Sequence, residues 1–182
     1  GYRGVSRYIK DIDVFEMELE AIKIVRNKKG LKNLWVMMPF VRTVQELREV
    51  KKIVSASGLR RSGTFKFWMM AEIPSNVVLL DDFIDEGIDG VSIGTNDLTM
   101  LILGVDRDNE KVADIYDEMN PAVLKSLEKI IKTCKKRGVT CSVCGQAPSV
   151  FPELVEMMVD WGVTSVSVSP DVIEKTRGIV YE

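Results

Sequence analysis

The chain has 182 residues, of which 46% are hydrophobic and 29% charged, which suits one globular domain with an ordinary core. Its formal net charge is −2 and basic residues are interspersed with acidic ones, which argues against partnership with nucleic acid or an anionic membrane. Three cysteines are too few for a disulfide-stapled module, and there is no signal peptide or long apolar run, so we expect a cytoplasmic protein with no membrane segment.

Two absences add to this picture. The sequence contains no histidine, so the commonest general base and any phosphohistidine chemistry are missing from these residues. It opens with "GYRGVSRYIK" rather than with methionine, and this opening is typical of the middle of a longer protein. We therefore expect a fragment of a larger parent.

The first third of the chain predicts a helix, a strand and a second helix. Phe15, Leu19 and Ile22 recur at helical spacing in a helix that ends at Gly30. The apolar run 34–40 predicts the first strand. The sequence "TVQE" at 43–46 is a capping-box pattern that predicts a helix start, and Gly58 follows this helix as a stop signal.

The remaining residues repeat the strand-and-helix alternation. Proline, asparagine and glycine mark the helix ends, as in Asn120 and Pro121 before a helix that runs to Gly138. A helix is also predicted from Pro74 to Gly87, and the last two helices begin near "PSVFPE" and "SPDV". The other predicted strands are 67–73, 90–95, 140–146 and 165–170.

This alternation predicts a single α/β domain over 1–182 with a parallel sheet of about five βα units. Such units can form an open doubly wound sheet or part of an eight-stranded barrel, and periodicity does not separate the two. The polar residues at the strand ends are more informative.

Two acidic residues lie where neighbouring strands are expected to end. Glu72 closes the second strand, while Asn96 and Asp97 follow the third, directly behind Gly94. The ends of adjacent parallel strands are about 5 Å apart, so the carboxylates would repel each other unless a cation lies between them. Mg²⁺ with oxygen ligands fits this arrangement. The alternative is that Glu72 pairs with a lysine and Asp97 only caps a helix.

Three loop arginines are candidates for binding phosphate or carboxylate. They are Arg3, Arg42 and Arg107, and each guanidinium offers a planar fork of donors. A solvated surface charge is the alternative for each of them.

The cysteines Cys141 and Cys144 form a C-x-x-C spacing that could indicate a zinc pair or a redox dithiol. Both fall in a predicted strand, where residues three apart point to opposite faces, so they are poorly placed to share a metal or form a disulfide. We interpret Cys141 as a core residue, as we do Cys134. Cys144 lies at the carboxyl end of its strand beside Gly145, where active-site groups of α/β folds gather.

Five segments together resemble the C-terminal barrel of the phosphoenolpyruvate synthases (pyruvate, water dikinases). These enzymes belong to the phosphoenolpyruvate (PEP)-utilising enzymes, with pyruvate phosphate dikinase and Enzyme I of the phosphotransferase system. The segments are "GYRGVSRY", "MMPFVRT", "MMAEIPSN", "SIGTNDLTMLILGVDRD" and "CGQAPS". They occur in the family's order and span nearly the whole chain.

The resemblance implies the C-terminal part of a PEP- and pyruvate-binding (β/α)8 TIM barrel. It implies Glu72 and Asp97 as Mg²⁺ ligands, and Cys144 as the catalytic proton donor or acceptor at the methylene carbon. It also implies that Arg3 and Arg107 meet the phosphate. Gly94, Thr95 and Asn96 would line the substrate. Arg42 matches a family motif without a firm role.

The resemblance also implies partners beyond this chain. In the family, a phosphohistidine domain and a nucleotide-binding domain of the parent chain handle the phosphoryl group, and three further barrel strands precede these five. We expect the fragment to be inactive alone and to associate through its open sheet edges, as in a homo-oligomer. Two other functions stay open: a Mg²⁺-dependent lyase acting on pyruvate or oxaloacetate, and a non-catalytic assembly module of a phosphotransfer complex.

Overall fold

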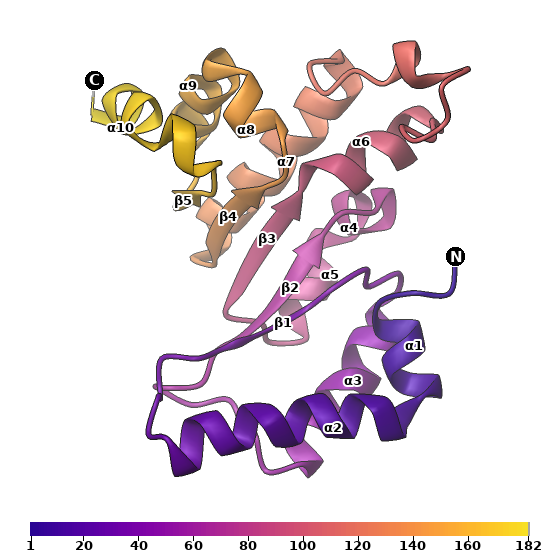
Figure 1. Cartoon of the computed structure of the whole chain (residues 1–182), viewed down its shortest axis with the longest axis vertical. Coiled ribbons are helices and arrows are strands. Elements are labelled where there is room, and N and C mark those ends of the chain that lie inside the picture. Colours follow the sequence, from indigo (N-terminus) through magenta and orange to yellow (C-terminus); the bar gives the residue numbers. More distant parts are fainter. Residues whose placement is uncertain (182) are drawn as a thin grey trace.

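A computed structural model describes residues 1–181 and contains a parallel sheet whose strands follow one another in chain order (Figure 1). Every strand pairs with the next one along the chain. A doubly wound sheet would reverse its strand order at a switch point, so this order is that of a barrel segment. The strands are β1 (Val36–Met38), β2 (Phe67–Ala71), β3 (Gly90–Gly94), β4 (Thr140–Cys144) and β5 (Ser165–Val166).

Helices precede the sheet and follow each strand, as the sequence predicted. Their bounds are α1 (Val5–Lys10), α2 (Ile12–Lys23), the π-helical turn η1 (Ile24–Lys28), α3 (Val44–Ala56), α4 (Pro74–Val78), α5 (Leu80–Asp85), α6 (Thr95–Leu103), the 3-10 turn η2 (Ala113–Ile115), α7 (Pro121–Arg137), α8 (Ala147–Val150), α9 (Pro152–Trp161), the 3-10 turn η3 (Pro170–Val172) and α10 (Ile173–Tyr181). No helix among residues 1–181 is both long enough and apolar enough to cross a bilayer.

The helix-capping predictions are confirmed by hydrogen bonds. The Thr43 hydroxyl accepts from the Glu46 N–H at 3.1 Å, and the Asn120 side chain accepts from the Ala122 N–H at 3.0 Å. The helix predicted from Pro74 to Gly87 is wrong in one respect, because the backbone leaves helical geometry at Leu79 and divides it into α4 and α5. The first and last strands are also shorter than predicted.

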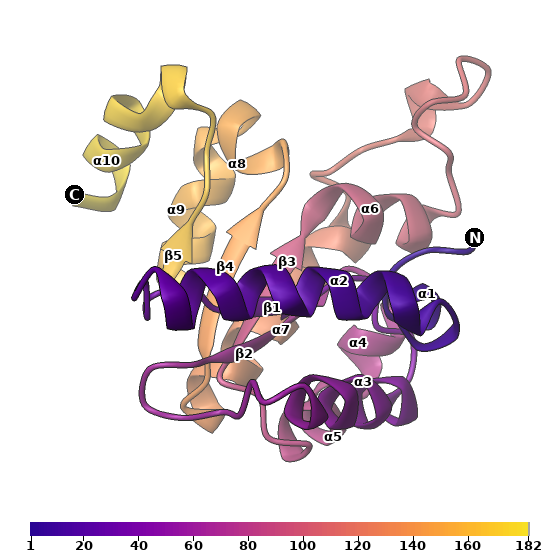
Figure 2. The ribbon, with the colours of Figure 1, turned by 60° about the horizontal axis from the view of Figure 1, so that its bottom comes forward.

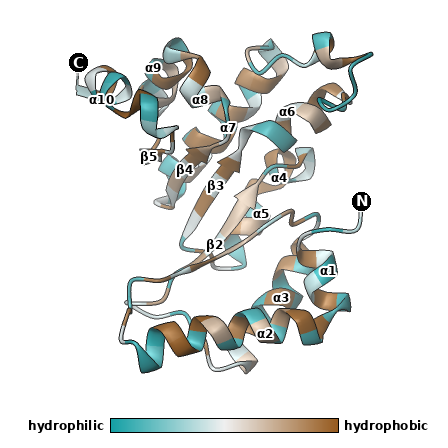
Figure 3. Ribbon diagram, viewed as in Figure 1, coloured by the Kyte–Doolittle hydropathy of each residue, from teal (hydrophilic) through white to brown (hydrophobic). Residues whose placement is uncertain are grey.

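The helices cover one face of the sheet in a single layer. In this layer α3 contacts α5, α5 contacts α7, α7 contacts α9 and α9 contacts α10. Met69, Val91 and Val143 point into the core beneath these helices and are fully buried. Met70 and Ser92 point to the opposite face, which corresponds to the lumen of a barrel. Figure 2 shows α6 and α8 at the carboxyl ends of β3 and β4. The loop between α6 and α7 is strongly hydrophilic, in contrast to the strands (Figure 3).

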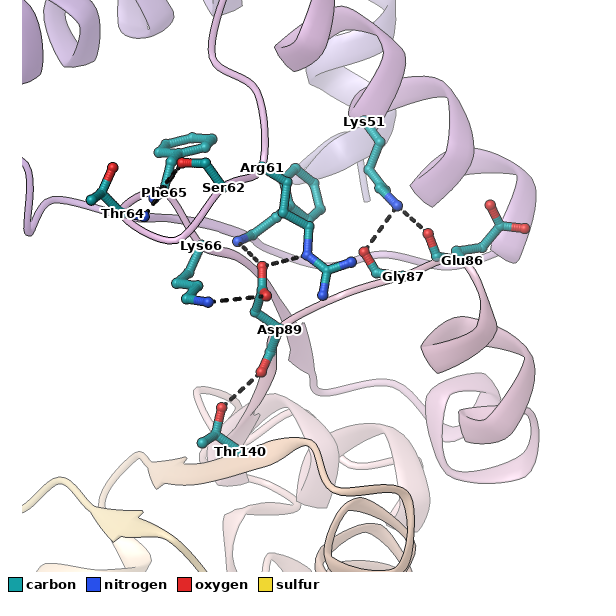
Figure 4. A network of polar contacts seen from close by, with 11 residues as sticks. Lys51, Arg61, Ser62, Thr64, Phe65, Lys66, Glu86, Gly87, Asp89 and Thr140 are labelled. Atoms are coloured by element: carbon teal, nitrogen blue, oxygen red, sulfur yellow. Dashed lines mark hydrogen bonds and ion pairs between the residues drawn. The ribbon is translucent and has the colours of Figure 1, made fainter.

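The amino ends of the strands are held by a polar network centred on Asp89 (Figure 4). Its carboxylate accepts from Arg61 Nε at 2.8 Å and from the Phe67 N–H at 2.9 Å, and Lys66 Nζ lies 3.7 Å away. Its backbone carbonyl accepts from the Thr140 hydroxyl at 2.8 Å, so one residue ties β2, β3 and β4 together. Burial opposes ionisation, but the Arg61 and Phe67 hydrogen bonds and the nearby positive charges outweigh it and hold the pKa of Asp89 below its usual value.

This network leads to a stability prediction. We expect Asp89→Asn to lower the free energy of unfolding by about 1–3 kcal/mol at pH 7, because the Phe67 N–H loses its charged acceptor. A depressed folded-state pKa stabilises the fold above the unfolded pKa of about 3.9, and the contribution is lost as pH falls through the folded value. The gap between wild type and variant should therefore shrink below about pH 4.

Urea unfolding followed by fluorescence would measure this, since Trp35 and Trp68 line the same cavity as Asp89. Asp160→Asn on the exposed side of α9 is the control and should change the free energy of unfolding by less than about 0.5 kcal/mol. Equal unfolding midpoints for Asp89→Asn and Asp160→Asn would contradict the role given to the network.

Candidate functional site

The carboxyl ends of β2, β3 and β4 bring three of the predicted site residues into one row. Gly94 pairs with Cys144, and Ala71 pairs with Ile93, so Glu72, the next residue of β2, lies level with Gly94. Neighbouring strands are about 4.8 Å apart, which places Glu72 and Cys144 on either side of Gly94. A Cβ at Gly94 would lie 2.8 Å from Glu72 Oε2, so only glycine lets the carboxylate lie across the β3 backbone.

Glu72 is 3% exposed and is held in place by backbone contacts. Its Oε1 accepts from the Phe40 N–H at 2.7 Å. Asn76, also buried, accepts from the N–H groups of Glu72 and Ile73 at 3.2 Å and donates to the Val41 carbonyl at 2.7 Å. The side-chain amide of Asn76 thus joins the end of β2 to the segment after β1, and the Phe40 N–H of that segment holds the Glu72 carboxylate.

The surroundings of Glu72 favour its protonated form. Burial raises the pKa of Glu72 to about 7, and the negative charge of Asp97 adds to the rise. The Phe40 N–H and the positive charge of Arg3 act in the opposite direction. Glu72 and Asp97 are therefore close neighbours whose like charges are only partly compensated.

Asp97 lies in the first turn of α6 and pairs with Arg3 through two hydrogen bonds. Arg3 Nη1 and Nη2 each donate to one carboxylate oxygen at 3.0 Å. The guanidinium also lies 4.4 Å from the centre of the Phe40 ring. A positive charge thus lies next to the two acids, as their mutual repulsion led us to expect. It is the guanidinium of Arg3, a residue of the same chain.

The segment that carries Arg3 is anchored to the end of β1. Gly4 has φ 64°, and a Cβ there would lie 2.4 Å from Phe40 Cβ, so glycine permits the contact. The Val5 N–H donates to the Pro39 carbonyl at 3.1 Å. Arg42 donates to Ser6 Oγ at 2.8 Å and to the Arg3 carbonyl at 3.2 Å, and its guanidinium lies 4.6 Å from the Phe40 ring centre. This gives Arg42 a structural role that the sequence left unassigned.

Cys144 lies on the face of β4 opposite Cys141, as strand alternation predicted. Its thiol donates to the Ile93 carbonyl at 3.4 Å, and the Ser92 hydroxyl contacts its Sγ at 3.6 Å. Cys141 is buried, and its contact with Cys134 together with burial raises the pKa of its thiol. The two cysteines of the C-x-x-C spacing therefore have different surroundings, and Cys144 is the partly exposed one.

The turns after β3 and β4 pack directly on each other. Gly145 has φ 113°, and a Cβ there would lie 2.1 Å from Thr95 Oγ1, which leaves no space for a side chain. The Asn96 side chain accepts from the Gln146 N–H at 3.1 Å. Thr95 and Asn96 therefore hold the Cys144 turn against the start of α6.

Arg107 lies in the loop after α6, where its charge acts on Glu118 and Tyr116. Its Nε is 3.9 Å from the Asp108 carboxylate, and the side chain is 35% exposed. The structure brings Arg3 to Asp97 but places Arg107 beside a different acid.

The sequence did not signal the contacts of Phe40, Asn76 and Glu118, and it gave Arg42 only as a candidate for binding phosphate or carboxylate. Phe40 has φ 49°, an uncommon value for a residue other than glycine, and no local motif signals it. In the sequence, Asn76 falls at the start of a predicted helix, and Glu118 belongs to no motif that the sequence signals. The one available signal was the position of Phe40 as the last residue of a predicted strand.

The donor set suits a hard cation that keeps open positions. Residues 1–181 contain no group of three or more Cys, Asp or Glu side chains arranged to hold a metal. The adjacent pair of Glu72 and Asp97 can supply two carboxylate ligands, and Mg²⁺ ordinarily takes one or two carboxylates and completes its shell with waters and substrate oxygens.

Comparisons with known proteins identify the family of the chain. The family model described as "PEP-utilising enzyme, PEP-binding domain" matches residues 1–182. The chain is 52% identical over 184 residues to a probable phosphoenolpyruvate synthase of Staphylothermus marinus, covering 99% of the chain and 22% of that protein. It is 51% identical over 181 residues to the phosphoenolpyruvate synthase of Aeropyrum pernix, covering 97% and 22% respectively.

A third relative is similar to the chain over nearly the same residues. The phosphoenolpyruvate synthase of Helicobacter pylori is 45% identical over 183 residues, which cover 99% of the chain and 22% of that protein. The chain thus spans about a fifth of the length of the curated relatives that it matches. By the family match and these identities, the chain belongs to the PEP-utilising enzymes and corresponds to their PEP-binding domain.

Proposed function

We propose that this chain is the PEP- and pyruvate-binding part of a phosphoenolpyruvate synthase, an enzyme that makes PEP from pyruvate and ATP. The observation that carries the proposal is the row of Glu72, Gly94 and Cys144 at the strand ends, with Arg3 and Asp97 paired beside it. Acids, a thiol and an arginine at one edge of a parallel sheet are the groups that enolate formation and phosphoryl transfer need.

In this proposal Glu72 and Asp97 hold Mg²⁺. When bound, the ion supplies positive charge that stabilises the enolate oxygen of pyruvate and the transferred phosphoryl group. The raised pKa of Glu72 supports this role, because a buried carboxylate beside another acid gains from a nearby cation. The fixed position of Glu72, through Phe40 and Asn76, keeps one ligand in place before the ion binds.

The remaining residues bind and orient the substrate. Arg3 and Arg107 are assigned to the phosphate, and Gly94, Thr95 and Asn96 to the wall of the substrate site. The close packing of Gly145 on Thr95 excludes water from the space between the two turns. Arg3 has two partners in this scheme, Asp97 and the phosphate, and its half-exposed side chain can reach outward from Asp97.

Cys144 is assigned to the carbon-bound proton. As a thiolate it takes a proton from the methyl group of pyruvate, and the electrons of the broken C–H bond form the enolate whose oxygen accepts the phosphoryl group. In the reverse direction the thiol returns this proton to the methylene carbon of PEP. Its contact with the Ile93 carbonyl gives the thiol proton a defined position.

The full reaction needs more than these residues. The sequence contains no histidine, so these residues cannot carry a phosphohistidine. We assign the phosphohistidine and the nucleotide site to other domains of a parent protein. We propose that the 182 residues alone do not complete the reaction and that the parent is a homo-oligomer. The names of the relatives favour this function over the lyase and assembly-module alternatives.

The metal assignment can be tested with oxalate, a planar dicarboxylate that resembles the enolate of pyruvate. In the protein at its full natural length, Glu72→Gln and Asp97→Asn should each weaken Mg²⁺-dependent oxalate binding at least about 100-fold, because each removes a charged ligand. Isothermal titration calorimetry with and without Mg²⁺ measures this.

The matched controls are Glu110→Gln and Asp114→Asn, which alter exposed acids of the loop between α6 and α7. They should leave the oxalate affinity unchanged. If Glu72→Gln and Asp97→Asn also bind oxalate with wild-type affinity, the assignment of these two residues as metal ligands is wrong.

The role of Cys144 predicts a selective loss. Cys144→Ala at full natural length should lower the rate of PEP formation by about 10²–10⁴-fold, because proton transfer loses its positioned group. Phosphoryl exchange between ATP and the phosphohistidine domain should continue. Both rates can be followed by isotope exchange, together with loss of deuterium from the methyl group of labelled pyruvate.

The control is Cys141→Ala, which removes the buried thiol on the opposite face of the same strand. In this variant the methyl group of labelled pyruvate should lose deuterium at the wild-type rate. Deuterium loss that persists in Cys144→Ala would assign the proton to another group.

A further inference from the structure

A buried acid outside the row of strand-end residues has no part in the scheme above. Glu118 is 7% exposed and lies near the end of the loop between α6 and α7. Acidic side chains are rarely buried to this extent unless they are paired or hydrogen-bonded, because an ionised carboxylate loses its hydration. Its contacts therefore indicate what the residue is for.

The surroundings of Glu118 consist of hydrogen-bond donors. Its Oε1 accepts from the Tyr116 hydroxyl at 3.1 Å and from the Thr95 hydroxyl at 3.3 Å. Burial raises the pKa of Glu118, while these two hydrogen bonds, the Ala147 backbone N–H and the charge of Arg107 favour the ionised form. A carboxylate has only acceptor sites, so it can serve several donors at once where an amide would add donors of its own.

The two hydrogen-bond donors to Glu118 come from two segments that carry predicted site residues, and the start of a third segment lies close enough to influence the pKa of the carboxyl. Thr95 begins α6 and precedes Asn96 and Asp97. Tyr116 belongs to the loop that carries Arg107. Ala147 begins α8, three residues after Cys144. The same place is where Gly145 packs on Thr95 without room for a Cβ.

We propose that Glu118 is a positioning residue that ties the Arg107 loop, the start of α6 and the turn after Cys144 into one unit. Its carboxylate is the common acceptor through which the loop between α6 and α7 is held against both turns. The consequence for catalysis rests on the proposed function: the phosphate-binding arginine and the proton-transferring thiol keep their relative positions only while this contact is intact.

The structural part of the proposal, which is that Glu118 couples three segments, can be tested without measuring activity. Amide hydrogen exchange measured by mass spectrometry, at full natural length, would compare wild type with Glu118→Gln, Tyr116→Phe and the control Glu110→Gln. In Glu118→Gln we expect exchange to rise about tenfold in residues 95–99, 105–118 and 145–149 together. Tyr116→Phe keeps the carboxylate and should give the same pattern with a smaller rise.

Glu110 is an exposed acid of the same loop, so Glu110→Gln should leave exchange at its wild-type level in all three segments. A rise confined to residues 105–118 in Glu118→Gln would overturn the proposal, because the acid would then hold only its own loop. If Glu118→Gln fails to fold, Tyr116→Phe decides by the same criterion.

Kinetics separate positioning from general stability. Glu118→Gln should lower kcat by about tenfold or more at a temperature where it remains folded, with a smaller change in KM for PEP, because misplaced groups slow the chemical step. An unchanged kcat with a lowered melting temperature would reduce Glu118 to a structural role and overturn the proposal. If wild type neither binds nor turns over PEP but the exchange pattern holds, the proposed function fails and the coupling of the three segments stands.

Discussion

The site depends on the charge repulsion between two acids that follow neighbouring strands. Glu72 is buried and Asp97 is its neighbour, so the negative charge of Asp97 disfavours the ionised form of Glu72 unless a cation compensates. In this structure Arg3 provides part of the compensation through its two hydrogen bonds to Asp97. The amino-terminal segment must therefore lie on the sheet edge, and the contacts of Gly4 and Arg42 with the end of β1 serve that requirement.

The two ends of the sheet have different tasks. At the amino end, Asp89 has its negative charge compensated by basic residues and joins three strands, which stabilises the fold. At the carboxyl end, charges are left incompletely compensated and glycine replaces side chains at Gly94 and Gly145. Because every strand is parallel, all strands end at the same edge, and chemistry and stability are separated along the strand direction.

Local rules account for much of what could be predicted. The caps at Thr43 and Asn120 depend on residues within three positions, and both are present as hydrogen bonds. The placement of Glu72 and Asp97 on neighbouring strand ends followed from the βα alternation alone. The break at Leu79 and the shortness of β5 were not predictable, because they depend on how neighbouring segments pack.

The sequence by itself determined the βα alternation, the acids and thiol at the strand ends, and the family, because these are written in residues close together in the chain. Only the tertiary structure decided that Arg3 pairs with Asp97 across 94 positions, that the Phe40 N–H donates to Glu72, and that Thr95 donates to Glu118. Such contacts form between residues far apart in the chain, and their partners are chosen by packing, which periodicity and capping rules do not describe.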